Sequence, residues 1–117
     1  MAGPLTTLSL EQVRARRDEI LALAAQHSAA NIRVIGSVAR GDADTSSDVD
    51  FLVDLDSSHR LRGFAYFGAL DALHRELEAT LGCTVDVIDA ASLAARSGEM
   101  PSRALFRERV LRDAVPL

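Results

Sequence analysis

Three short runs of apolar residues, rich in β-branched side chains, constrain the fold of this chain more than any other feature. They are Ile32–Ile35, Val49–Leu55 and Thr84–Ile88, and their length and composition are typical of β-strands. In the second run every other position is apolar, so one face of this strand is expected to be buried. Longer segments of helical composition separate the runs, which predicts an α+β fold with α/β-type alternation.

The segments between the runs carry the signals of helices. Ser9, followed three residues later by Gln12, forms a capping box that predicts a helix start. Gly82 predicts the end of a helix whose apolar residues recur at helical spacing. The expected order is helix, strand, helix or turn, strand, helix, strand, helix. The helices are expected at residues 10–27, 38–40, 61–81 and 102–113, with a further helix-prone stretch from residue 90.

Length and composition set outer bounds on function. The 117 residues predict a single domain spanning 1–117, with residues 1–8 as a flexible N-terminal tail. A net charge of −4 argues against direct binding of nucleic acid, which requires clustered basic residues. No apolar stretch is long enough for a membrane span, and no signal peptide is visible. The single cysteine suits a reducing cytoplasm, where we expect the protein to act.

Two aspartates stand at the start of the second strand. Asp48 and Asp50 are separated by one residue, so their side chains are expected to project from the same face. Like charges placed so closely repel unless a cation lies between them, and Mg²⁺ is the hard divalent ion that carboxylates prefer. Asp86 lies within the third strand, where an unpaired charge is costly, and is the expected third carboxylate. Asp89 is a weaker candidate that is favoured as a helix cap.

A Gly-Ser pair follows the first strand. Gly36 allows a tight turn and a close approach of the backbone to a ligand. A helix that begins at Ser37 would direct free N–H groups, and the serine hydroxyl, towards an anion. Arg40, one turn further, could reach the same anion, although pairing with Asp42 or Asp44 is an equally good interpretation of this arginine.

The stretch GSVARGDADTSSDVDFLVDL at residues 36–55 resembles a known family signature. A Gly-Ser pair, ten residues and an Asp-x-Asp motif are typical of the DNA polymerase β-like nucleotidyltransferase superfamily. The Ala-Arg-Gly that follows the Gly-Ser pair is similar to the minimal nucleotidyltransferases, known as MNT proteins. The later VDVI, at residues 85–88, resembles the strand that carries the third aspartate of the family. The resemblance implies the nucleotidyltransferase fold, a small mixed β-sheet with helices packed on it.

The resemblance also implies a nucleotide-binding role for three residues. Gly36 and Ser37 match the positions that hold the β- and γ-phosphates of a nucleoside triphosphate. Arg40 matches the arginine of the family motif and is a phosphate contact by the same comparison. ATP is the expected substrate, although no sequence motif identifies the base.

Three aspartates match the metal-binding and catalytic positions of the family. Asp48 and Asp50 are expected to bind Mg²⁺, with two ions present when nucleotide is bound. Asp86 is expected to complete the metal site and to help activate the acceptor hydroxyl. The implied reaction is attack of that hydroxyl on the α-phosphate, with release of pyrophosphate.

The small size of the chain narrows the implied function, because larger relatives carry a helical domain for the acceptor. MNT proteins of this size are typically bacterial or archaeal antitoxins paired with a HEPN-domain ribonuclease toxin. The resemblance therefore implies transfer of AMP to a hydroxyl, expected to be a tyrosine, of a HEPN partner held in a hetero-oligomer. Two alternatives remain open: a non-catalytic antitoxin that binds and occludes its partner, and a nucleotidyltransferase that modifies a small molecule of the aminoglycoside type.

Overall fold

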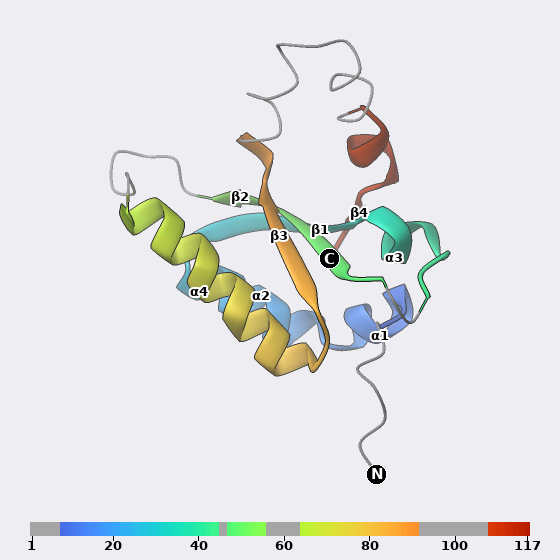
Figure 1. Ribbon diagram of the computed structural model, residues 1–117, viewed down its shortest axis with the longest axis horizontal. Coiled ribbons are helices and arrows are strands. Elements are labelled where there is room, and N and C mark those ends of the chain that lie inside the picture. Colours follow the sequence, from blue (N-terminus) through green and yellow to red (C-terminus); the bar gives the residue numbers. More distant parts are fainter. Residues whose placement is uncertain (1–7, 45–46, 56–63, 92–107) are drawn as a thin grey trace.

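A four-stranded mixed sheet forms the centre of the molecule. This computed structural model describes residues 8–44, 47–55, 64–91 and 108–117. Strands β1 (Ala29–Ile35), β2 (Val49–Leu55), β3 (Val85–Asp89) and β4 (Val115–Pro116) lie in the order β3-β2-β1-β4. β1 pairs antiparallel with β2 and with β4, whereas β2 and β3 are parallel (Figure 1). The predicted mixed sheet with packed helices is confirmed.

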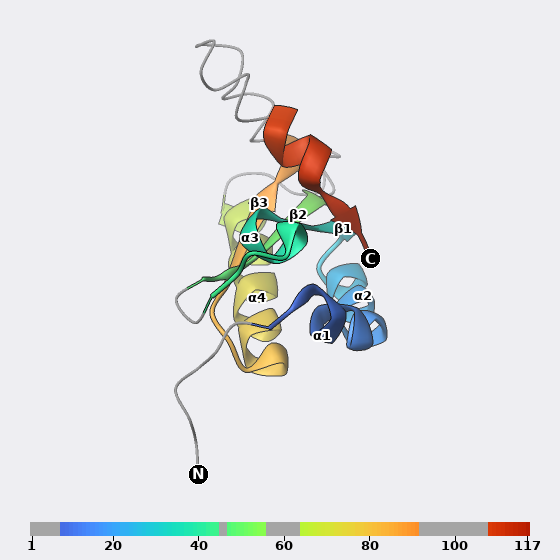
Figure 2. The ribbon, with the colours of Figure 1, turned by 90° about the vertical axis from the view of Figure 1, so that its right-hand side faces the viewer.

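Helices cover one face of this sheet. α1 (Leu10–Ala15), α2 (Arg17–Gln26) and α4 (Phe64–Leu81) lie on the same side of the strands (Figure 2). The short α3 (Gly36–Arg40) follows directly after β1. None of the helices within the described residues is long and apolar enough to span a membrane.

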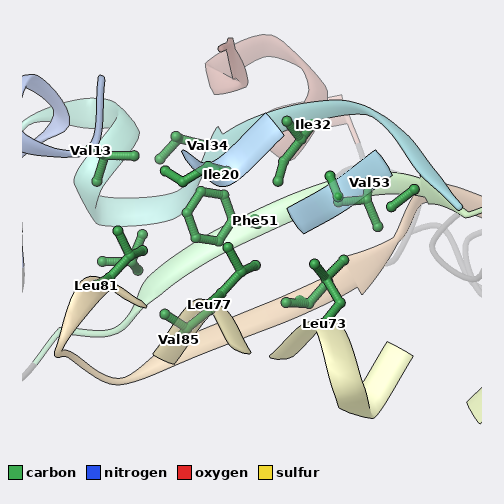
Figure 3. Close-up of a cluster of buried hydrophobic side chains, with 14 of the residues drawn as sticks. Val13, Ile20, Ile32, Val34, Phe51, Val53, Leu73, Leu77, Leu81 and Val85 are labelled. Carbon is green, nitrogen blue, oxygen red and sulfur yellow. The ribbon is translucent and has the colours of Figure 1, made fainter. Parts of the chain in front are cut away.

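The main hydrophobic core fills the space between the sheet and these helices. Phe51 and Val34, paired across β1 and β2, point towards Leu73 and Leu77 of α4 (Figure 3). All four side chains are fully buried, and each contributes roughly 1.5–3 kcal/mol relative to exposure. This core anchors β2 and thereby fixes the opposite face of the same strand.

A smaller cluster lies on that opposite face. Ile35 and Leu52 are buried against Val110, which belongs to a helical segment at residues 108–113. We call this the C-terminal helical segment, and Figure 2 shows it, in red, on the side of the sheet away from α2 and α4. The sheet is thus covered on both faces, unequally.

Several element bounds differ from the expectation. The single helix predicted over 10–27 is wrong, because Arg16 leaves the helical conformation (φ −107°, ψ 20°) and separates α1 from α2. β1 begins at Ala29, earlier than predicted, and contains a bulge between Ala30 and Arg33. β4 was not predicted, since a two-residue strand containing proline has almost no sequence signal.

Other expectations are met within the described residues. The capping box at Ser9 and Gln12 is present, and β2 has the predicted bounds. Gly82 ends α4 with φ +69°, and its N–H donates to the carbonyl of Glu78. Residues 90–91 and 108–113 are helical, whereas residues 61–63 and 92–107 of the predicted helices, and residues 1–7 of the predicted tail, lie outside the described ranges. Leu8 packs against the core.

Candidate active site

Two of the predicted aspartates lie side by side on neighbouring strands. Asp50 of β2 is paired in register with Asp86 of the parallel strand β3. Neighbouring strands are about 4.8 Å apart, and residues in register point to the same face. That face is the one opposite the main core, because Phe51 and Val87 point the other way into it. Asp48 lies just before β2 and is exposed.

The Gly36 backbone lies against the Asp50 carboxylate. Ile35, the last residue of β1, is paired with Asp50, so the turn that follows it passes beside that side chain. Gly36 has φ +72°, and a Cβ built on it would lie 2.5 Å from Asp50 Oδ2. The positive φ favours glycine at this position, and any larger residue would in addition force the Asp50 carboxylate to shift. The glycine of the Gly-Ser pair and the second aspartate of the Asp-x-Asp motif form one local unit.

The electrostatic environment of Asp50 favours a bound cation. Burial, followed by the negative charges of Asp86 and Asp48, raises the pKa of Asp50 from 3.8 to about 6, while the positive charge of Arg40 lowers it. An anionic carboxylate is thus destabilised here by its surroundings. A divalent cation beside Asp50 and Asp86 would relieve both the burial and the repulsion.

The carboxylates suit Mg²⁺ in kind, although they are not gathered into a compact triad. In the part of the chain that the structure describes, no three His, Cys, Asp or Glu side chains are close enough together to hold a metal ion. Mg²⁺ commonly takes one or two protein carboxylates and completes its shell with water and substrate phosphates. Asp50 and Asp86 fit this requirement, with Asp48 at the edge of the site.

A cleft of about 620 Å³ opens at these residues. Of the six predicted site residues, Gly36, Arg40, Asp50 and Asp86 line it, whereas Ser37 and Asp48 do not. Ser37 adjoins Gly36 in the first turn of α3. The remaining lining residues are Ile35, Ile88, Arg109, Val110 and Asp113.

Arg40 pairs with Asp42, one of the interpretations that its sequence context left open, and it also lines the cleft. Its Nε lies 3.3 Å from Asp42 Oδ2, and its Nη1 lies 4.0 Å from Asp113 Oδ2. The side chain is about half exposed, at 47%, so these pairs are readily exchanged for another anion. Arg40 therefore lines the cleft while it pairs with carboxylates at the rim.

The sequence reasoning missed the residues contributed by the C-terminal helical segment. Arg109 and Asp113 line the cleft, yet they lie far along the chain from the motifs. Only the packing of Val110 on the sheet brings them there, and no local pattern signals it. Asp89, in contrast, is buried and accepts a hydrogen bond from the N–H of Ala91 at 3.2 Å, in agreement with the favoured interpretation as a cap.

Comparison with known proteins gives a consistent result. The profile of a family described as "Nucleotidyltransferase domain" matches residues 17–112. A solved structure assigned as a minimal nucleotidyltransferase is 39% identical, with a TM-score of 0.69, and the match covers 94% of this chain and 97% of that one. A toxin-antitoxin crystal structure with AMP-PNP has a similar fold, with a TM-score of 0.50 at 18% identity over 90% of this chain and 86% of that one. No curated protein matches significantly.

Proposed function

Because this chain belongs to the nucleotidyltransferase domain family, we propose that it transfers AMP from Mg²⁺-ATP to a tyrosine hydroxyl of a HEPN ribonuclease toxin and thereby neutralises it. The observation that carries the proposal is the pairing of Asp50 with Asp86 in a cleft where Gly36 brings the backbone against Asp50. Two carboxylates that suit a divalent metal thus lie beside the Gly-Ser turn, which supports a role for both in the proposed reaction.

Each residue of the site has a separate task in this proposal. Asp50 and Asp86, with Asp48 at the edge, would hold Mg²⁺, which stabilises charge on the phosphates during transfer. The Gly36-Ser37 turn receives the phosphate tail. The absence of a side chain at position 36 leaves the space beside Asp50 free for it, since a Cβ there would contact the Asp50 carboxylate. Arg40 exchanges its rim carboxylates for phosphate oxygens, which a guanidinium binds more tightly than an exposed carboxylate.

The chemical step is a single displacement at the α-phosphorus. The acceptor oxygen forms a bond to phosphorus as the bond to the β-phosphate oxygen breaks, and pyrophosphate leaves with the electron pair. The hydroxyl proton passes to the carboxylate of Asp86, which is exposed at the cleft. General-base assistance of this kind contributes typically 10²–10⁴-fold to rate.

Support for the antitoxin role comes from similarity to other proteins, and not from the geometry of the site. The toxin-antitoxin structure with AMP-PNP shares this fold. The HEPN identity of the partner and its hetero-oligomeric association follow from the resemblance of the Gly-Ser and Asp-x-Asp motifs to MNT proteins.

The test is transfer of label from α-labelled ATP to a HEPN-domain protein encoded beside this chain. We expect the wild-type protein to label that partner in Mg²⁺ and to relieve its ribonuclease activity, and Asp50→Asn to do neither. Asp71→Asn, the same change at an exposed position of α4, is the matched control and should behave as wild type.

Three results would contradict the proposal. Relief of the ribonuclease without label, equally by wild type and Asp50→Asn, would identify a non-catalytic antitoxin. Label on an aminoglycoside in place of the partner would identify a small-molecule enzyme. Absence of Mg²⁺-ATP binding would refute the nucleotidyltransferase activity altogether.

A further inference from the structure

One wall of the cleft comes from a part of the chain outside both motifs. The C-terminal helical segment contributes Arg109, Val110 and Asp113 to the lining. Val110 is only 9% exposed and is buried against Ile35 and Leu52. The segment is therefore packed onto the sheet through Val110, and this packing holds the neighbouring Arg109 beside the cleft.

The residues on which Val110 packs are close in sequence to the motif residues. Ile35 immediately precedes Gly36, and Leu52 lies two residues after Asp50 on the same face of β2. On the far side of the segment the chain enters β4, where Val115 pairs with Val34 of β1. Val110 within the segment and β4 after it therefore hold the segment beside the Gly-Ser turn and the paired aspartates.

The charges that line the cleft give Arg109 a distinctive position. Two arginines, Arg40 and Arg109, line the cleft together with the carboxylate residues Asp50, Asp86 and Asp113. Arg40 is already paired with Asp113 and with a second rim carboxylate. Among the described residues, Arg109 forms no ion pair, and its side chain is exposed to solvent.

We propose that Arg109 is a nucleotide-binding residue that contacts the β- and γ-phosphates of the triphosphate from the C-terminal wall of the cleft. The planar guanidinium donates two parallel hydrogen bonds to phosphate oxygens, and the terminal phosphates carry most of the negative charge. The positive charge of Mg²⁺ would be shared between the carboxylates of Asp50 and Asp86 and the substrate. The negative charge of the terminal phosphates would therefore be only partly neutralised without a further cationic side chain. This inference rests on the proposed function, since it assumes that the cleft receives a nucleoside triphosphate.

Calorimetric titration of the full chain with Mg²⁺-ATP tests the proposal. Loss of a charged hydrogen-bonding partner weakens binding roughly ten- to hundredfold, so Arg109→Gln should raise the Kd for Mg²⁺-ATP by that factor. The affinity for Mg²⁺-AMP, measured by competition, should stay unchanged, because AMP lacks the terminal phosphates. Arg109→Lys, which keeps the charge and loses the two-pronged geometry, should lie between wild type and Arg109→Gln.

Arg112→Gln is the matched control. Arg112 is exposed on the same helical segment and does not line the cleft, so its removal changes the net charge equally without removing the contact. Both glutamine variants should unfold at the wild-type temperature, since each replaces an exposed side chain. Equal weakening by the two variants, or equal losses for ATP and AMP, would overturn the assignment.

The outcomes separate this inference from the proposed function. If wild type binds Mg²⁺-ATP and Arg109→Gln binds it equally well, the role of Arg109 is refuted while the proposed function stands. If wild type binds Mg²⁺-ATP through Arg109 but labels no partner, the proposed transfer is refuted while the role of Arg109 stands. A wild-type chain that binds no Mg²⁺-ATP refutes both.

Discussion

Replacement of Asp50 by asparagine should make the protein more stable while it abolishes transfer. Asp50 lies beside Asp86 and under the Gly36 turn, where burial and neighbouring negative charge oppose its ionisation. Asparagine has nearly the same shape and no charge, so it removes the repulsion without leaving a cavity. Asp50, to which the proposed function assigns a metal-binding role, thus lowers the stability of the fold when no cation is bound.

The size of the effect follows from the pKa of Asp50. A pKa raised from 3.8 to about 6 corresponds to about 3 kcal/mol of unfavourable interaction with the charged form. Because the side chain is only partly buried, solvent screening reduces this to about 1–2 kcal/mol. For a chain of this size that gain is a rise in Tm of roughly 4–8 °C.

The effect has a defined pH dependence. Between pH 3.8 and about 6 the native protein holds a proton on Asp50 that the unfolded chain has lost, so wild-type stability falls as pH rises through this window. Asp50→Asn does not titrate. Its advantage should therefore be absent near pH 4, grow through pH 6 and remain constant above pH 7.

Thermal unfolding in the presence of EDTA, followed by circular dichroism at several pH values, measures this difference. Addition of Mg²⁺ should stabilise wild type and narrow the gap, since the cation relieves the repulsion only where the carboxylate is present. Asp71→Asn on α4 should change stability by less than about 0.5 kcal/mol at every pH. A gap that is independent of pH, or an Asp50→Asn variant no more stable than wild type at pH 8, would refute the electrostatic reasoning.

Three further substitutions test the geometry of the cleft. Gly36→Ala should lower the free energy of unfolding by about 1–3 kcal/mol and abolish label transfer. Gly41→Ala is its control, because Gly41 has φ +81° but no atom within 4 Å of the added Cβ, so this variant should suffer backbone strain alone and keep transfer. Loss of transfer in both variants would show that backbone strain, and not the close approach to Asp50, is responsible. Asp113→Asn should remove one of the two carboxylates that pair with Arg40, with Asp42 remaining, and improve Mg²⁺-ATP binding by up to a few-fold in calorimetry. Weaker binding would mean that Asp113 assists the substrate. Val110→Ala should lower the free energy of unfolding, measured by chemical denaturation, by about 1–2 kcal/mol, because it removes packing between the C-terminal helical segment and the sheet. It should also weaken Mg²⁺-ATP binding, and unchanged binding would show that the position of this segment does not affect the site.

The sequence was most informative where local pattern and function coincide. The alternation of Val49 to Leu55 predicted β2 to the residue, and Asp50 lies on the face opposite the main core, as that alternation predicted. Gly36 was predicted to allow a tight turn after the first strand, and the structure shows that turn, with φ +72° and the Gly36 backbone against Asp50. Short-range periodicity and turn chemistry are sufficient for such features, because each depends on neighbours in the chain.

Features that depend on distant partners could not be predicted in the same way. No proline or glycine marks the break at Arg16, which lies between two helices that both contribute side chains to the main core. β4 is a strand only because β1 offers it an edge. Arg109 enters the cleft only because Val110 finds a seat on Ile35 and Leu52. Contacts between residues that are distant in the chain leave no recognisable pattern in any short stretch of a single sequence.

The late position of the C-terminal helical segment has a consequence for the order of folding. During synthesis the strands that carry Asp50 and Asp86 emerge before residues 108–117, so the aspartate pair can form while one wall of the cleft is still missing. The contact between β4 and β1 closes a long loop and is expected to form late for the same reason. Under the proposed function, full affinity for nucleotide should thus appear only once residues 108–117 have folded onto the sheet.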